Sequence, residues 1–219
     1  MKREKSDSVN REIVWKKTNK ALSLTGETVL ELSLCWPEPE EKILGSVRRY
    51  YQKLKERFQT QWETQLYLCA CMDLVEKREE DKVFYPWRAS LAGEVTWQDE
   101  NCVSIAMTVQ EERGDRRILE YRWGDVWRWE DGCPVRLKDC VSGRRGWKRR
   151  LRDSLAEAAD ALRKQGIYLD PKEINCLNQY ISLDRFALTE QEFIFYCPQC
   201  TAAPAVEGVL ELRIPRTQA

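Results

Sequence analysis

The chain has 219 residues, of which 42% are hydrophobic and 33% charged, a composition typical of a globular chain. Thirty-six basic residues balance 36 acidic ones, so no net field attracts nucleic acid or an anionic membrane, and any electrostatic partner must be recognised locally. Histidine is absent, which excludes nucleophiles activated by imidazole, zinc held by histidine and a histidine general base.

The N-terminal part of the chain predicts a β-hairpin. Residues 1–10 are polar and charged, which predicts a disordered arm, and no apolar segment follows their basic start. Because the chain also lacks a run of roughly 18 apolar residues, it is expected, as written, to be cytoplasmic and to have no membrane span. Strands at 13–24 and 30–36, where apolar residues alternate with polar ones, are expected to pair around Gly26.

The spacing of apolar residues changes after Pro39 and predicts a long helix. Apolar residues then recur every three or four positions, at Ile43, Val47, Tyr50, Leu54, Phe58, Trp62, Leu66, Cys69 and Met72. This spacing places one apolar stripe along a helix of about eight turns, which a charged run at 76–82 ends. The stripe is expected to pack on the sheet. The alternative is a coiled-coil surface for a partner, although Tyr50 and Trp62 are bulkier than the residues that such a seam favours.

The central part of the chain predicts a meander of strands. Val95 and Trp97 precede a turn at 99–101, apolar residues alternate from 103 to 109, and Gly114 turns the chain again. In the next strand four aromatic residues share one face: Tyr121, Trp123, Trp127 and Trp129. Such a row is either the core side of a sheet covered by a helix or an aromatic surface that stacks on a sugar or a peptide.

A second helix is predicted at 146–165, with Gly166 as its C-terminal stop. Basic residues crowd its N-terminal turn, where the helix dipole disfavours cations. Together with free backbone N–H groups, four of them could bind a phosphate, a carboxylate or the acidic surface of a partner: Arg144, Arg145, Lys148 and Arg149. The alternative is a screened basic face paired with acidic residues elsewhere.

The closing part of the chain predicts two strands around a loop. Residues 192–196 are apolar on both faces, which predicts a central strand, and residues 210–214 alternate, which predicts a strand with one wet face. The loop carries Cys197 and Cys200, the only Cys-x-x-Cys pair. A single pair leaves a zinc or redox site as a remote alternative, so no metal and no cofactor are expected. The nine cysteines are irregularly spaced, which favours reduced thiols that serve as small core residues.

Together these elements predict an α+β fold in which an antiparallel β-sheet, made of a hairpin and a meander, packs against one long and one shorter α-helix. A division near Asp81 would follow the arm with two subdomains. Residues 11–82 would hold the hairpin and the long helix, and residues 83–219 would hold the remaining sheet and helix.

Two segments, LTEQEFIFYCPQCTAAPAVEGVLELRIP and WRWEDGCPVRLKDCV, carry a resemblance to a known family. The first resembles the closing strand, proline-containing loop and final strand of the RsiV-like domain of unknown function, and the second resembles the segment before its helix. This family occurs in bacterial lysozyme-sensing anti-sigma factors and beside peptidoglycan deacetylase domains. The resemblance runs in order over about 30–214, and it implies a recognition module. It also implies an extracytoplasmic location if the chain is a trimmed member of the family.

The expected function is therefore non-catalytic recognition of an unknown protein or anionic ligand by a domain related to cell-envelope sensing modules. Two alternatives stay open. One is an enzyme that uses carboxylates or a thiolate in a groove between the long helix and the sheet. The other is a local binder of anions or nucleic acid through the basic cluster at 144–152, although nucleic acid is the less favoured partner because the net charge is zero.

Overall fold

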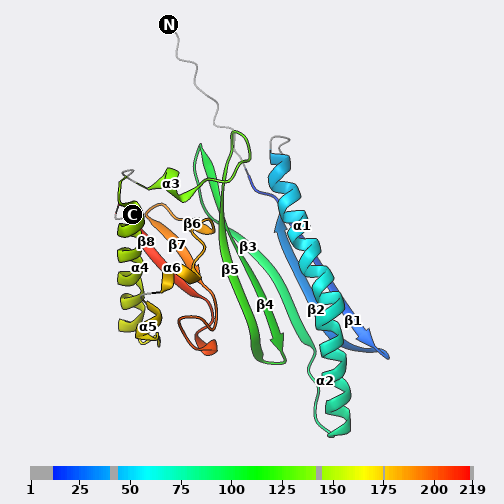
Figure 1. Ribbon diagram of the computed structural model, residues 1–219. Helices are drawn as coiled ribbons and strands as arrows, with labels where there is room; N and C mark the ends of the chain where they lie inside the picture. Colours follow the sequence, from blue (N-terminus) through cyan, green and yellow to red (C-terminus); the bar gives the residue numbers. More distant parts are fainter. Residues whose placement is uncertain (1–11, 40–43, 142–144, 175, 218–219) are drawn as a thin grey trace.

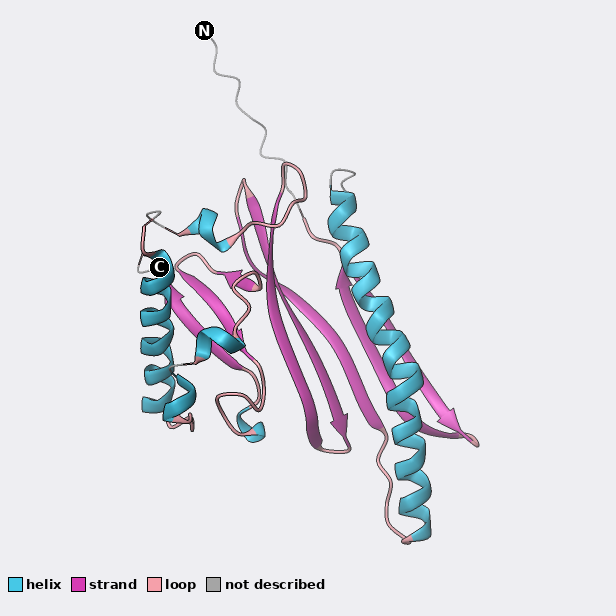
Figure 2. Cartoon of the chain, viewed as in Figure 1, coloured by secondary structure: helices cyan, strands magenta, loops and turns pink. Residues whose placement is uncertain are grey.

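The computed structural model describes residues 12–39, 44–141, 145–174 and 176–217 (Figure 1). The predicted arm therefore lies outside the described residues. The fold is α+β, as predicted, and its strands are mostly antiparallel. Five strands form one sheet beside a long helix, and three further strands form a second sheet beside a shorter helix (Figure 2). The single sheet of the prediction is thus divided into two.

The larger sheet contains the first five strands in chain order. They are β1 (Trp15–Leu24), β2 (Glu27–Pro37), β3 (Trp87–Gln98), β4 (Cys102–Arg113) and β5 (Arg116–Arg128). All neighbours are antiparallel except β2 and β3, whose parallel register places Leu30 opposite Trp87. A parallel pair requires a crossover connection, which the long helix supplies. Because β2 and β3 belong to one sheet, the predicted ranges 11–82 and 83–219 do not coincide with a boundary between the two sheets.

The long helix consists of α1 (Gly45–Gln61), a π-helical turn (Trp62–Leu66) and α2 (Tyr67–Glu79). From Val47 to Leu66 it packs on the sheet along the predicted stripe, whose first residue, Ile43, lies outside the described residues. The buried face then continues at Ala70 and Leu74, whereas the predicted Cys69 and Met72 are exposed. From Trp62 to Leu74 the buried apolar side chains recur every four residues, a longer repeat than the 3.6 residues of an α-helical turn. The π-helical turn absorbs the difference and keeps the buried face on the sheet.

Two buried carboxylates accept indole N–H groups between the long helix and the sheet. Trp62 Nε1 donates to Glu111 Oε1 at 2.7 Å, and Trp87 Nε1 donates to Asp73 Oδ2 at 2.8 Å. Arg113 also donates to both carboxylate oxygens of Asp73. Burial by itself would raise the pKa of Asp73, but the bonds from Arg113 and Trp87 outweigh it and hold that pKa below its usual value. These carboxylates therefore help to fix the helix on the sheet.

The second sheet contains β6 (Phe186–Leu188), β7 (Glu192–Cys197) and β8 (Leu210–Pro215), antiparallel and in that order. The central position of β7 confirms the prediction from its two apolar faces. The shorter helix, α4 (Trp147–Lys164), matches the second predicted helix and shares a hydrophobic cluster with this sheet. Short connecting helices are α3 (Leu137–Cys140), α5 (Pro171–Ile174), α6 (Leu177–Tyr180) and a 3-10 turn (Ala205–Glu207).

The second sheet packs on the face of the larger sheet that lies opposite the long helix. At Gly124 in β5 the backbone of β6 comes so close that an added Cβ would lie 2.2 Å from the nitrogen of Ala187. Next to this crossing, Leu188 donates its backbone N–H to Ser104 Oγ at 2.7 Å. Where β6 and β7 contact the larger sheet, they do so mainly at β4 and β5. The candidate site lies on the same face of the larger sheet, on β1 to β3 and the adjoining end of β4.

Candidate functional site

A groove of about 560 Å³ lies on the larger sheet, on the face opposite the long helix, and is called the sheet groove below. Its lining comes from four neighbouring strands, β1 to β4. One row of side chains across these strands is uncharged, and it consists of Asn19, Ser33, Ser90 and Gln110. A second row, two residues along each strand, contains Glu31, Arg88 and Glu112. The groove therefore has a neutral row and a charged row.

The strand register explains why the neutral residues meet. Asn19 lies opposite Ser33, Ser33 opposite Ser90, and Ser90 opposite Gln110. Gln110 Nε2 donates to Glu120 Oε1 at 3.4 Å. Within the part of the chain that the structure describes, the side chains of Asn19, Ser33 and Ser90 form no hydrogen bond with the protein. These three groups are thus free to bond to water or to a ligand.

The side chains of the charged row form ion pairs with one another. Arg88 lies between two glutamates, with its Nε 3.6 Å from Glu31 Oε2 and its Nη1 3.7 Å from Glu112 Oε2. All three side chains are partly exposed, so solvent screening leaves these pairs worth little in stability. They border the groove with polar side chains that carry one net negative charge.

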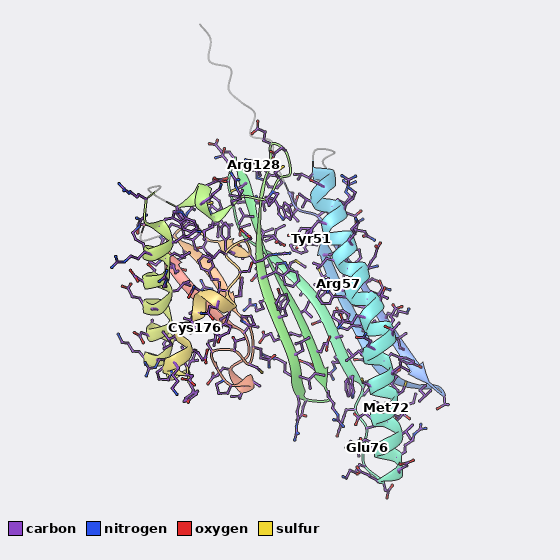
Figure 3. The ribbon with its side chains drawn as sticks, viewed as in Figure 1. Tyr51, Arg57, Met72, Glu76, Arg128 and Cys176 are labelled. Atoms are coloured by element: carbon purple, nitrogen blue, oxygen red, sulfur yellow. The ribbon has the colours of Figure 1, made fainter. Side chains whose placement is uncertain are left out.

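A buried polar cluster lies on the other face of the sheet, around Asp125. Asp125 Oδ2 accepts from Trp123 Nε1 at 2.9 Å and from Tyr51 Oη at 3.2 Å. Asp125 Oδ1 accepts from Arg185 Nη1 at 2.8 Å. Figure 3 shows Tyr51 on the side of α1 that faces the strands. Burial raises the pKa of Asp125, although the Arg185 charge opposes that shift, and burial also raises the pKa of Tyr50 to about 12.

The four predicted aromatic residues lie on β5 and just beyond it, and three of them are buried on the helix side of the sheet. Trp123, Trp127 and Trp129 are only 3%, 8% and 2% exposed, whereas Tyr121 is 44% exposed. Trp123 and Trp127 donate their indole N–H groups to Asp125 and Tyr51. The row does not form an open aromatic surface, because the long helix covers most of it and leaves only Tyr121 accessible.

The predicted basic cluster lies around the start of α4. Arg144 is outside the described residues, and Gly146 forms the N-terminal cap with no side-chain bond. Lys148 Nζ is 5.7 Å from the centre of the Trp147 ring, and Arg149 Nε is 4.0 Å from Asp153 Oδ2. These contacts involve exposed groups of low energetic weight. Anion binding by Arg145, Lys148 and Arg149 stays a prediction.

All nine cysteines are free thiols in the structure, and of these only Cys197 is fully buried. A role as small core residues therefore fits Cys197, but it does not fit Cys69, Cys133 and Cys200, which are exposed. Cys197 Sγ lies 3.1 Å from Thr201 Oγ1, and burial raises the pKa of the Cys197 thiol. Burial also raises the pKa of Cys102 to about 12. Among the described residues no three side chains of the Cys, Asp and Glu type gather as metal ligands.

The residues of the sheet groove were not predicted from the sequence. Asn19, Ser33, Ser90 and Gln110 are each an ordinary outward-facing residue of an alternating strand. They form a row only because β2 and β3 pair side by side in parallel across a connection of about fifty residues. The usable signal was limited to Ser33 and Ser90, two short outward side chains on neighbouring strands.

Comparisons with known proteins support the fold. Neither a scan against protein-family models nor a search of curated proteins finds a match. Among solved structures, a DUF3298 family member from Bacteroides fragilis is similar, with a TM-score of 0.61, 16% sequence identity, and coverage of 94% of this chain and 90% of that chain. A DUF3298 family protein from Pseudomonas aeruginosa has a TM-score of 0.51, with 16% identity and the same coverage. The chain thus has an α+β fold like that of these DUF3298 proteins. No helix in the described part is long and apolar enough to cross a membrane.

Proposed function

We propose that this chain is a non-catalytic recognition domain that binds a protein segment or a small ligand in the sheet groove. The observation that supports the proposal is the row of three adjacent polar side chains, Asn19, Ser33 and Ser90, which line a groove of about 560 Å³ and have no protein partner among the described residues. Sites of this kind combine a concave shape with a few convergent polar groups. A kinship with RsiV-like cell-envelope sensing modules, which the closing segment suggests, belongs to the same proposal.

The environments of the acidic and thiol groups favour binding over catalysis. A carboxylate enzyme needs an accessible acid or base with a shifted pKa. Asp125 has a raised pKa, but its oxygens are held by Trp123, Tyr51 and Arg185, and it is not among the residues that line the sheet groove. A thiolate enzyme needs a lowered thiol pKa, whereas burial raises that of Cys102 and Cys197.

Replacing Ser90 with tryptophan should block the sheet groove without unfolding the protein. Ser90 is one of the two middle residues of the neutral row and lies on a strand, where an aromatic residue is compatible with the backbone. A ligand at a concentration of 100 times its Kd stabilises the wild type by about 2.7 kcal/mol. Thermal-shift screening with peptides and oligosaccharides should find compounds that stabilise the wild type but not S90W.

The matched control is Ser182→Trp, which adds the same side chain at an exposed position outside the groove. S182W should respond to each compound as the wild type does. Both variants should melt near the wild-type temperature when no compound is present. Compounds that stabilise S90W as strongly as the wild type would show that ligands bind elsewhere and would refute the proposal.

A further inference from the structure

The chemistry of the groove lining restricts the class of ligand. Among the described residues that line it, none is aromatic. Recognition of sugar rings or nucleobases usually relies on stacking against a flat aromatic face. The exposed Tyr121 cannot supply one, because it shares the helix-facing side of β5 with Trp123. The sheet groove therefore lacks the surface that would favour a carbohydrate or a base.

The charges of the lining disfavour an anion. Lys20 also borders the groove, but its Nζ lies on the helix side of the sheet, 3.0 Å from Glu63 Oε1 on the long helix. The other charged side chains are Glu31, Glu112 and Arg88, which lies between them, so together they carry one net negative charge. A phosphate or a polyanion would find no unpaired cation here. The lining instead matches a polar ligand that carries no negative charge.

The neutral row has the right groups and length for a peptide backbone. Side-chain amides such as those of Asn19 and Gln110 both donate and accept hydrogen bonds, as peptide groups do, and so do the hydroxyls of Ser33 and Ser90. Neighbouring strands lie about 4.8 Å apart, so a row across four strands spans about 14 Å. An extended chain rises about 3.4 Å per residue. The row therefore matches a segment of about four residues.

We infer that the sheet groove binds an extended peptide segment without acidic side chains, which lies across the strands β1 to β4. The amides of Asn19 and Gln110 bond to its backbone at the two ends, and Ser33 and Ser90 bond to it in the middle. The short side chain of Ala21 allows the segment to approach the sheet. This inference rests on the proposed function and adds the chemical class of the ligand.

The test is binding of defined probes, measured by fluorescence anisotropy. The peptide probe is a labelled library of seven-residue peptides with blocked ends, composed of Ser, Thr, Asn, Gly, Ala and Val. The other probes are a labelled hexamer of N-acetylglucosamine and labelled heparin. The proteins are the full chain, S90W, the double variant N19A/Q110A and a control double variant, N101A/Q52A, which removes the same two amide types outside the groove.

Peptides are expected to bind the full chain and the control double variant equally. They should bind N19A/Q110A about tenfold more weakly, because two hydrogen bonds are lost. They should not bind S90W. Peptide binding that disappears in S90W but is unchanged in N19A/Q110A would overturn the recognition of the backbone. Binding of the N-acetylglucosamine hexamer or heparin alone, lost in S90W, would overturn the peptide inference and leave the proposed function standing. Binding of every probe that is unchanged in S90W would overturn both.

Discussion

Replacing Arg185 with methionine should lower the free energy of unfolding by about 3 kcal/mol at neutral pH. The substitution leaves the carboxylate of Asp125, which is buried, without its counter-charge. The loss is placed at the lower end of the range for such pairs because the Arg185 side chain is 40% exposed, so water can reach part of the site. Urea denaturation followed by tryptophan fluorescence measures the change.

The dependence of this loss on pH identifies its cause. Burial already raises the pKa of Asp125 in the folded protein, and removal of Arg185 should raise it further. An acid whose pKa is higher in the folded than in the unfolded state favours folding when protonated, and that contribution is lost as the pH rises through the folded-state pKa. The deficit of R185M should therefore shrink as the pH is lowered from neutral. The double variant D125N/R185M should show a deficit that changes little with pH, and an equal deficit for R185M at every pH would contradict this account.

Replacing Gly124 with alanine should destabilise the protein by about 3 kcal/mol or more, because the methyl group enters a space filled by backbone. The added Cβ would lie 2.2 Å from Ala187 N and 2.2 Å from the carbonyl carbon of Phe186. Unlike a side chain, this backbone cannot rotate away, so β6 must move and the two sheets must separate. Thermal unfolding measures the loss, and faster proteolysis of the region after β5 would report the separation.

Gly45 provides the control for this substitution. An alanine Cβ at Gly45, the first residue of α1, meets nothing within 4 Å. G45A should therefore stay within about 1 kcal/mol of the wild type, because alanine favours the helix and no contact is disturbed. Equal stability of G124A and G45A would show that the two sheets do not approach as closely as the structure places them.

The sequence predicted the individual helices and strands better than it predicted which strands pair with each other. The repeat of apolar residues along the long helix and the alternation in β2 and β4 come from contacts with a single covered face, so they are visible in a short window. The parallel pairing of β2 with β3 joins residues on both sides of that helix, and no short window contains it. The shift of the buried face to Ala70 and Leu74 depends on a π-helical turn that the apolar spacing alone did not indicate.

The division into two sheets left one trace in the sequence. Gly124 interrupts a strand of large residues, and a glycine inside a strand often marks a close approach of another backbone. The groove left no comparable trace, since Ser33 and Ser90 are unremarkable until the register places them side by side. The pattern of Trp123 and Trp127 fits both a covered core and a binding surface, and only the position of α1 distinguishes the two.

Photo-crosslinking tests the role of the sheet groove most directly. Benzoylphenylalanine replaces Ala21, which lines the groove and is exposed, or Met72, which is 72% exposed on α2 at the helix side of the sheet (Figure 3). After irradiation of each variant in cells of its native host, mass spectrometry identifies the covalent adducts. The account predicts a specific adduct from position 21 that S90W abolishes, and none from position 72. Adducts from position 72 alone, or from position 21 regardless of S90W, would contradict it.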